Sequence, residues 1–318
     1  MTTIAETATT AALLTRVAAV RAAESVSPEA SAAVALPLFM RVGGRLPVRP
    51  ADRAVHESAK RSTIRVRGRD LATYEWGSGP DTILLVHGWR GRASQFAPIV
   101  RELRAEGFRL LAFEAPANGE SPGRRTDIRD WLAAIDALQA REGRFHTIIG
   151  HSFGAMAARA AIADGTSAGG LVAVAGPSRA RFLVDAFAQR IGARPSTADA
   201  LAARFARRIL PHIADPWSRF DGAANPLPER MPLLVVHDRG DREVPASEGV
   251  RLHDAHGARS RLLLTDGAGH NRVLGADATL DAVTAFVTGG PDGVDRAGLD
   301  QADALAHGAR AAAGADAA

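Results

Sequence analysis

The sequence contains no cysteine. Disulfides, thiolate catalysis, iron–sulfur clusters and cysteine-bearing zinc sites are therefore all excluded. Long apolar runs are missing too, because no uninterrupted apolar stretch reaches the length that a membrane-spanning helix needs. The N-terminus lacks a secretory pattern, since its first basic residue, Arg16, lies inside the only apolar stretch nearby. We expect a soluble, cytoplasmic protein with no membrane partner.

Lysine is nearly absent, since Lys60 is the only one, and arginine carries almost all of the positive charge. The formal net charge is only +4, yet the isoelectric point is about 10.6, because arginine keeps its proton to very high pH. Basic residues are interspersed with acidic ones, as in Arg129–Asp130, and form no stripe interleaved with aromatic residues. The charge therefore predicts no nucleic-acid partner. Heavy use of Ala, Arg and Gly is typical of a GC-rich bacterial genome.

Short apolar runs alternate with helical patterns from residue 63 onward. Two alternating stretches, 63–67 and 71–76, flank a turn at Gly68 and predict an antiparallel hairpin. The runs that follow are apolar at almost every position, which is typical of strands buried on both faces of a parallel sheet. These runs are 82–86, 109–113, 147–149, 171–174, 233–236 and 261–264. Helical patterns between them predict crossover helices, and the whole order predicts an α/β protein with a mostly parallel, doubly wound sheet.

The length of 318 residues suits one core with additional segments. Residues 1–61 are predicted to form a helical, partly flexible N-terminal extension, and the core is predicted at 62–176 and 231–288. The intervening stretch, 177–230, has helical patterning and is too long for an ordinary connection, so it predicts an inserted helical cap. Residues 289–318 are rich in Gly, Ala and Asp and predict a flexible tail.

The strongest local signal is Gly150–His151–Ser152–Phe153–Gly154, which stands between a predicted strand and a predicted helix. A G-x-S-x-G pattern at such a junction is typical of a sharp, strained turn that lifts a serine hydroxyl out of the sheet. Glycine is needed on both sides because a Cβ there would collide with neighbouring backbone. Ser152 is therefore the candidate nucleophile, and His151 is interpreted as a residue that packs the turn.

A second signal, His87–Gly88–Trp89–Arg90–Gly91, follows the predicted strand 82–86 directly. Acyl transfer passes through an oxyanion that needs two aimed N–H donors, each worth about 3 kcal/mol. We expect one donor to be the backbone N–H of Phe153 and the other to be that of Trp89. His87 is interpreted as a structural histidine that holds this loop.

A base and an acid are expected after the serine in chain order, each beyond the C-terminal end of a strand. The last predicted strand leads into a glycine-rich loop, which allows the imidazole of His270 to turn back over the sheet. His270 would take the proton of Ser152 through one ring nitrogen while a carboxylate fixes its tautomer through the other. Two carboxylates after the preceding strand, Asp238 and Asp241, compete for that role.

Residues from about Thr63 to Thr288 resemble the α/β-hydrolase superfamily. The motifs stand in the family's order, and they are His87–Gly88–Trp89, the loop Ala115–Ser121, Gly150–Gly154, Asp241 with Val244–Pro245, and Gly269–His270. The resemblance implies an α/β-hydrolase fold, into which the helical cap predicted above is inserted. It also implies a D-x-x-V-P element whose aspartate, Asp241, is the acid, so that Asp238 becomes a loop-structuring group. The family commonly has Asp and then Gly-His-Gly at the exit of the third strand, whereas this chain has Glu114 and Ala117–Asn118–Gly119, and we expect altered packing there.

Motifs and resemblance together predict a hydrolase that cleaves a carboxylic ester or a related acyl substrate through an acyl-enzyme on Ser152. Its partner would be a small acyl molecule, with the cap lining the pocket. No paired His, Asp or Glu spacing suggests a metal, so neither metal nor cofactor is expected. Two alternatives stay open: a C–C bond hydrolase or lyase with the same residues, and a non-catalytic sensor of a small ligand. His253 and His256 are predicted to be solvated.

Overall fold

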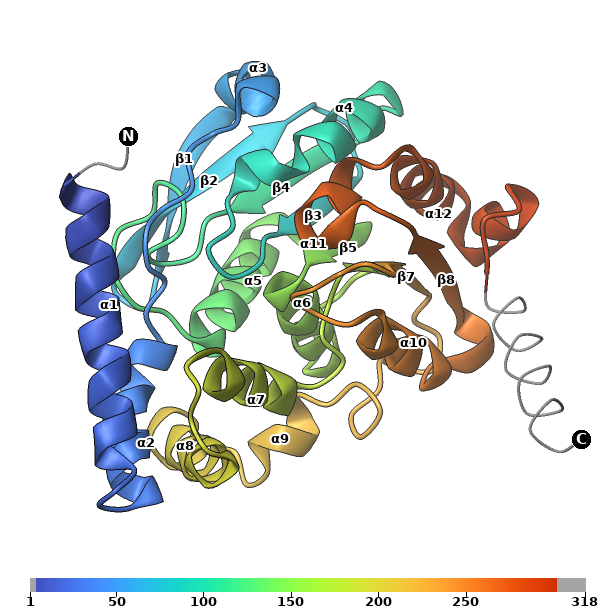
Figure 1. The fold of residues 1–318 in the computed structure, drawn as a ribbon. Helices are drawn as coiled ribbons and strands as arrows, with labels where there is room; N and C mark the ends of the chain where they lie inside the picture. Colours follow the sequence, from blue (N-terminus) through green and yellow to red (C-terminus); the bar gives the residue numbers. More distant parts are fainter. Residues whose placement is uncertain (1–3, 302–318) are drawn as a thin grey trace, which may run out of the picture. The chain divides into compact units, whose positions relative to one another are not determined.

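The computed structural model describes residues 4–301, with side chains from Leu13 onward, as two compact units (Figure 1). The larger unit comprises Val42–Ser178 and the described residues from Asp221 onward. The smaller unit comprises the described residues up to Arg41 together with Arg179–Phe220. Within residues 4–301, all eight strands of the sheet belong to the larger unit, and the smaller unit is built from helices.

The larger unit is built on one sheet with the strand order β1-β2-β4-β3-β5-β6-β7-β8. The strands are β1 (Lys60–Val66), β2 (Arg69–Trp76), β3 (Thr82–Val86), β4 (Arg109–Phe113), β5 (Thr147–His151), β6 (Leu171–Val174), β7 (Leu233–Asp238) and β8 (Ser260–Thr265). β1 and β2 form the predicted hairpin, β2 also runs antiparallel to β4, and all the remaining pairs are parallel. The predicted mostly parallel sheet is confirmed.

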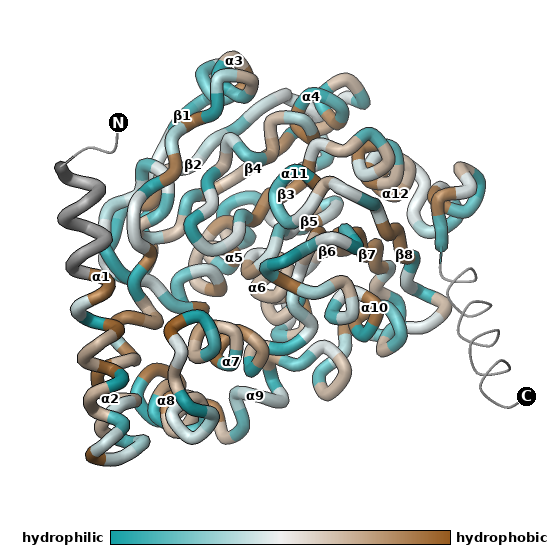
Figure 2. The backbone as a smooth tube through the Cα atoms, viewed as in Figure 1, coloured by the Kyte–Doolittle hydropathy of each residue, from teal (hydrophilic) through white to brown (hydrophobic). Residues whose placement is uncertain are grey.

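Central strands of this sheet are buried at every residue because helices cover both faces. β3, β5, β6 and β7 have no exposed position, which accounts for their apolar sequences. The hydrophobic stretches of β7 and β8 are brown in Figure 2. β1, at the outer edge, is by contrast mostly exposed.

Helices flank the sheet, and they are α3 (Arg53–Glu57), α4 (Ala97–Ala105), α5 (Ile128–Glu142), α6 (Phe153–Ala163), α10 (Ala246–Asp254), α11 (Gly269–Arg272) and α12 (Asp277–Arg296). α4 and α12 contact each other on one face, and α5 and α6 contact each other on the other (Figure 1). The main apolar core lies between the first pair and the strands, and its members include Ile83, Leu85, Ile99, Val100, Ile149, Val236, Val283 and Phe286.

The parallel register brings the C-terminal ends of β3, β5, β7 and β8 to one edge of the sheet. Val86 pairs with Gly150, and Asp238 pairs with Thr265. The segments that leave these strands therefore start from the same edge, where open α/β sheets bind their ligands. These segments carry the residues predicted to do chemistry.

The smaller unit joins two distant stretches of the chain, and its helices are α1 (Ile4–Ala23), α2 (Pro28–Phe39), α7 (Ala180–Arg190), α8 (Pro195–Ile209) and α9 (Pro216–Arg219). α2 packs against α1 and α8. Phe39 at the end of α2 makes edge-on contacts with Phe187 and Phe205, at ring-centroid distances of 5.2 and 5.7 Å. Glu24 accepts a hydrogen bond from the backbone N–H of Arg194 at 2.7 Å. The N-terminal helices therefore share one core with the inserted helices.

The unit boundaries differ from the predicted ones. Of the predicted extension, 1–61, only the part up to Arg41 belongs to the helical unit. The insertion ends at Phe220 rather than at residue 230, because an ion pair of 2.8 Å joins Asp221 to Arg251 of α10 in the larger unit. Composition does not reveal such limits, since they depend on contacts between stretches that are far apart in the chain.

The predicted flexible tail, 289–318, is wrong in its first part. α12 continues to Arg296 after a kink at Gly290, where φ is +63° and a proline follows that can restart a helix. Val294 is fully buried, and Asp295 accepts a hydrogen bond of 2.6 Å from Arg261 of β8, so this part of α12 is anchored to the edge of the sheet. Residues 302–318 lie outside the described residues.

Candidate active site

Ser152 lies at the sharp turn between β5 and α6. Its φ of +55° and ψ of −125° put a non-glycine residue in a strained conformation of the kind that clusters at functional sites. A Cβ on Gly150 would come within 2.5 Å of the Ala155 Cα, and one on Gly154 would overlap the carbonyl of Val86. Both glycines are therefore required for the backbone segments to approach this closely.

Ser152, His270 and Asp241 form a continuous series of hydrogen bonds across three loops. Nε2 of His270 is 2.9 Å from Oγ of Ser152, and Nδ1 of His270 is 2.7 Å from Oδ2 of Asp241. Because a carboxylate can only accept, Nδ1 carries the imidazole proton, and Nε2 is left to accept from the serine hydroxyl. An imidazole held in this tautomer is able to take the serine proton as a base.

Both oxygens of Asp241 have donors. Oδ1 accepts from the backbone N–H groups of Glu243 and Val244, at 2.8 and 3.0 Å. Oδ2 accepts from His270 and also lies 3.3 Å from Nε2 of His237, which donates to the Val244 carbonyl at 2.8 Å. Burial raises the pKa of Asp241, but the hydrogen bonds from His237, His270 and the Val244 amide outweigh it and hold the pKa well below its usual range. Asp241 is therefore a carboxylate at neutral pH.

His237 is a residue of this site that the sequence analysis does not single out. It is fully buried near the end of β7, four residues before Asp241. A histidine at the end of an apolar run, close to a candidate acid, is the signal that points to it. Its contacts with Asp241 and Val244 depend on how the next turn folds back, which the sequence pattern does not specify.

Asp238, the alternative acid, has different partners. Its Oδ1 accepts from the Gly240 N–H at 2.9 Å, and its Oδ2 accepts from the Thr265 hydroxyl and the Ala268 N–H at 2.8 and 2.9 Å. Burial raises the pKa of Asp238, but these donors and the Gly269 N–H lower it on balance. Asp238 therefore ties the end of β7 to the loop that leaves β8, as expected for a loop-structuring group.

The loop after β3 passes directly beside Ser152. A Cβ on Gly88 would lie 2.8 Å from the Ser152 Cβ. Trp89 is the next residue of this loop, and Phe153 is the first residue of α6, where backbone N–H groups have no partner within the helix. In the part of the chain that the structure describes, neither the Trp89 nor the Phe153 N–H donates to a protein acceptor. Both predicted donors are therefore free to bind an oxygen near the serine.

Three aromatic rings stabilise the backbone that carries these two amides. Trp89 stacks on Trp131 with the ring centroids 6.0 Å apart, and Phe153 contacts both rings edge-on at 5.6 and 4.8 Å. The indole N–H of Trp131 donates to the His87 carbonyl at 3.0 Å. The cluster thus joins the loop after β3 to the start of α6 and to α5.

Residues 83–288 match the model of the alpha/beta hydrolase family, and this range is more than half of the chain. The protein is an alpha/beta hydrolase. The matched range contains Ser152, Asp241 and His270, and it ends inside α12. No protein of curated function matches the sequence of this alpha/beta hydrolase.

The structure of this alpha/beta hydrolase is similar to solved structures of other proteins. An esterase of Pyrococcus furiosus is 20% identical with a TM-score of 0.58, over 77% of this chain and 97% of the esterase. The mouse alpha/beta hydrolase domain-containing protein 10 is 17% identical with a TM-score of 0.56, over 75% of this chain and 99% of its own. At such identities the likeness concerns the fold alone, and it confirms the predicted α/β-hydrolase fold.

His87 of this alpha/beta hydrolase ties the loop after β3 to the loop after β4. Its Nε2 accepts from the Ala115 N–H at 2.9 Å, which leaves the proton on Nδ1 to donate to the Gly88 carbonyl at 2.7 Å. Burial lowers the pKa of His87 to about 4, so the ring is neutral at neutral pH. The predicted structural role of His87 is confirmed.

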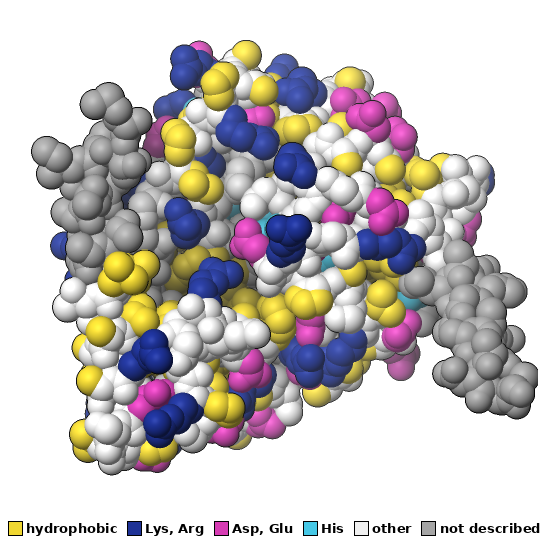
Figure 3. Space-filling model, in the orientation of Figure 1, with side chains coloured by type: hydrophobic (Ala, Val, Ile, Leu, Met, Phe, Trp, Pro, Cys, Tyr) yellow, Lys and Arg dark blue, Asp and Glu magenta, His cyan; other side chains and the backbone are white. Residues whose placement is uncertain are grey.

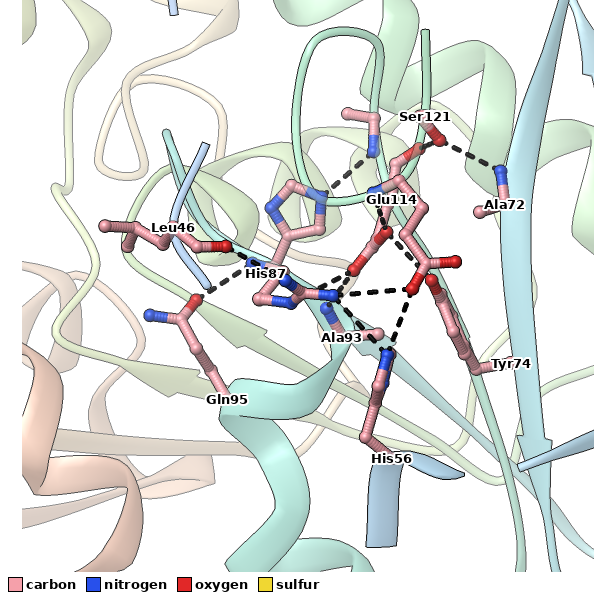
Figure 4. Close-up of polar contacts among 12 residues, drawn as sticks. Leu46, His56, Ala72, Tyr74, His87, Ala93, Gln95, Glu114 and Ser121 are labelled. Atoms are coloured by element: carbon pink, nitrogen blue, oxygen red, sulfur yellow. Dashed lines mark hydrogen bonds and ion pairs between the residues drawn. The ribbon is translucent and has the colours of Figure 1, made fainter. Parts of the chain in front are cut away.

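Glu114, where the chain departs from the family pattern, is the centre of a buried polar network (Figure 4). The carboxylate is fully buried and accepts from the Tyr74 hydroxyl at 3.0 Å and from the Ala93 N–H at 3.1 Å. Nε of Arg92 lies 3.7 Å from its Oε1. Gly119 leaves room for this side chain, because a Cβ there would overlap the carboxyl group. The longer Glu therefore ties the loop after β3 to β2 and β4.

Replacing Glu114 with leucine is expected to lower the free energy of unfolding by about 3–5 kcal/mol. The Tyr74 hydroxyl and the N–H groups of Ala93 and Glu120 would then lose their buried acceptor, and the Arg92 guanidinium would lose the carboxylate beside it. Urea unfolding measures the change, and Glu102→Leu on the exposed side of α4 is the control, expected within about 0.5 kcal/mol of wild type. A Glu114→Leu protein as stable as the wild type would show that the network does not hold the loop.

The prediction that His253 and His256 are solvated is wrong. His256 is 5% exposed, its Nδ1–H donates to the Leu252 carbonyl at 2.7 Å, and its Nε2 accepts from the Leu227 N–H at 3.1 Å. His253 is half-buried and bonds Ser260 at 3.0 Å. Burial lowers the pKa of both. The segment that follows the inserted helices packs on α10 and covers it, which a polar helix pattern does not reveal.

Lowering the pH is expected to destabilise this alpha/beta hydrolase even at pH values above those at which carboxylates titrate. Burial lowers the pKa of His87 to about 4 and that of His151 to about 3, from an ordinary value of 6.5. The unfolded chain therefore binds more protons than the folded one below about pH 6.5, and stability falls as the pH drops. The expected loss between pH 8 and pH 5 is on the order of 2 kcal/mol for each histidine.

Urea unfolding at pH 8, 6.5 and 5 measures this loss. The lowered pKa values of Asp238 and Asp241 contribute in the same direction only as the pH approaches the ordinary aspartate value of 3.8 and below. A free energy of unfolding that stays constant from pH 8 to pH 5 would show that these two histidines are protonated in the folded protein.

Other features of the surface lie outside this site. A groove of about 520 Å³ between α4 and α12 is lined by acidic residues, which gather at the upper right of Figure 3, and neither Ser152, His270 nor Asp241 lines it. Among residues 4–301, no group of three or more His, Cys, Asp or Glu is arranged to hold a metal ion. No helix in the described chain has the length and apolarity to cross a membrane.

Proposed function

We propose that this alpha/beta hydrolase is a serine hydrolase that cleaves a carboxylic ester, or a related acyl bond, in a small molecule. One observation carries the proposal: the hydrogen-bonded series from Asp241 through His270 to Ser152. It places an acceptor nitrogen against a strained serine and a carboxylate behind that nitrogen, which is the arrangement that activates a serine nucleophile.

The first half of the reaction forms an ester on the serine. Nε2 of His270 takes the hydroxyl proton while Oγ of Ser152 bonds to the substrate carbonyl carbon. The carbonyl oxygen becomes an oxyanion and accepts from the Trp89 and Phe153 N–H groups. The Phe153 N–H stands at the N-terminus of α6, whose partial positive charge favours the anion. His270 then gives its proton to the leaving oxygen as the carbon–oxygen bond breaks.

The second half of the reaction hydrolyses the acyl-enzyme. His270 takes a proton from water, the resulting hydroxide adds to the acyl carbon, and the second oxyanion uses the same two amides. The carboxylic acid leaves as Ser152 recovers its proton from His270. Asp241 stays ionised throughout, because the donors on both of its oxygens keep its pKa low, and it stabilises the imidazolium of each step.

Labelling with a fluorophosphonate, followed by peptide mass spectrometry, tests the proposal. We expect rapid adduct formation on the peptide that contains Ser152, with no labelling of heat-denatured protein, because only the folded site activates the hydroxyl. p-Nitrophenyl esters and thioesters of graded acyl length would then define the substrate class. A folded protein that is not labelled, and that small ligands stabilise without turnover, would instead support the binding-only alternative.

A further inference from the structure

His151 connects the two loops that carry the proposed nucleophile and base. It immediately precedes Ser152, and its Nε2 is 2.8 Å from the backbone carbonyl oxygen of His270. Because a carbonyl can only accept, Nε2 carries the proton and donates it to His270. The two imidazole rings lie 5.0 Å apart, centroid to centroid, and His151 is 3% exposed. A buried hydrogen bond therefore spans 119 positions of the chain beside the reacting atoms.

The segment around His270 has other attachments on either side of it. Asp238 accepts from the N–H groups of Ala268 and Gly269, and the Arg272 guanidinium donates to the Gly267 carbonyl at 2.9 Å. Asn271, the residue after it, is 3.5 Å from the amide of Gln95 at an exposed position. Among the described residues, no side chain other than His151 bonds the backbone of His270 itself. Asp241 holds the imidazole of His270, while its backbone is held by one buried side-chain donor, which comes from the turn that carries its partner serine.

We propose that His151 is a positioning residue for the hydrolysis, whose N–H fixes the His270 backbone and so sets the contact between Nε2 of His270 and Oγ of Ser152. This inference rests on the proposed function of that pair. The contact is 2.9 Å long, and a displacement of about 1 Å at such a contact costs about a hundredfold in rate. His151 itself does not exchange protons with the substrate, because burial keeps it neutral, with a pKa of about 3.

Three variants separate this role from packing. His151→Leu removes the donor, while His151→Gln offers an amide N–H close to the position of Nε2. His256→Leu is the matched control, because His256 is also buried and also donates to a backbone carbonyl. That carbonyl belongs to Leu252 in α10. Ester turnover is measured per folded molecule, with the folded fraction taken from urea unfolding.

We expect His151→Leu to lower kcat by about 10- to 100-fold with KM changed by less than about threefold, since the substrate still binds the same surface. His151→Gln should keep kcat within about threefold of wild type. His256→Leu should keep the wild-type kcat even where its stability falls as far as that of His151→Leu. Wild-type kcat in His151→Leu, equal losses in His256→Leu, or no rescue by His151→Gln would overturn the proposal.

Proton NMR gives a readout that does not require turnover. The Nδ1–H of His270, bonded to Asp241 at 2.7 Å, should give a downfield resonance in the wild type, His151→Gln and His256→Leu. His151→Leu should shift or broaden it, and an unchanged resonance would contradict positioning by His151. Absence of labelling and turnover in the wild type would contradict the proposed function instead. The NMR comparison would still test whether His151 positions His270.

Discussion

Replacing Ser152 with alanine is expected to lower kcat by on the order of 10⁶-fold, which is the largest effect among these predictions. The Oγ that would form the acyl bond is removed, and His270 is left without a hydroxyl to activate. The two backbone amides remain, so a small residual rate over uncatalysed hydrolysis should persist. The measurement is steady-state hydrolysis of the best p-nitrophenyl ester, together with the burst of p-nitrophenol that an acyl-enzyme gives and that the variant should lose.

Ser260→Ala is the matched control for that experiment. Ser260 is buried at the start of β8, where its hydroxyl bonds His253, at the opposite end of the strand from the loop that carries His270. The control should keep the wild-type kcat and burst. Turnover that survives in Ser152→Ala would mean that another group attacks the substrate, and the acyl-enzyme mechanism would be abandoned.

Replacing Asp241 with asparagine is expected to lower kcat by about 10⁴-fold. The N–H groups of Glu243 and Val244 hold Oδ1, so the asparagine oxygen will occupy that position and its NH₂ group will face His270 and His237. The imidazole of His270 would then accept at Nδ1 and carry its proton on Nε2. In that tautomer it cannot take the proton of Ser152. The pH dependence of kcat and the rate of fluorophosphonate labelling measure the loss.

Asp238→Asn is the control, and it also decides between the two carboxylates that the sequence leaves open. Both oxygens of Asp238 face donors, so the NH₂ group of the asparagine would point at an N–H or O–H group. The free energy of unfolding should therefore fall by about 1–3 kcal/mol. The kcat of the folded protein should stay within about tenfold of wild type. A loss of kcat in Asp238→Asn equal to that in Asp241→Asn would remove the distinction between them.

The sheet could be predicted from the sequence because strands buried on both faces are uniformly apolar. The limits of β3, β4 and β6 are those predicted, and β5, β7 and β8 extend beyond the predicted runs by one or two residues at an end. β5 and β7 extend through His151, His237 and Asp238, which are polar and yet buried. Hydrogen bonds rather than apolarity make the burial of these side chains possible, so a hydropathy pattern stops short of them.

The site could be predicted only as far as local geometry determines it. Ser152 stands in a turn that its own neighbours impose. Asp238, Asp241 and His270 lie at or beyond the ends of β7 and β8, which meet at one edge of the sheet. The choice of partner for each carboxylate oxygen, and the contacts of His237 and Glu114, arise between loops that are distant in sequence. These contacts depend on side-chain placement to within about an ångström, which periodicity and motif spacing do not specify.

On the ribosome, the helices before Arg41 are made long before the helices they pack against. Residues 42–178 separate them from α7 and α8, and at about 5–20 residues per second this stretch takes on the order of 10–30 s to synthesise. Throughout that time Phe39 has neither Phe187 nor Phe205 to cover it. The strands β1 to β6 emerge in the same interval and can pair. Growth of the nascent chain thus allows the sheet to start before the helices up to Arg41 meet α7 and α8, and these helices can be covered before β7 and β8 are made.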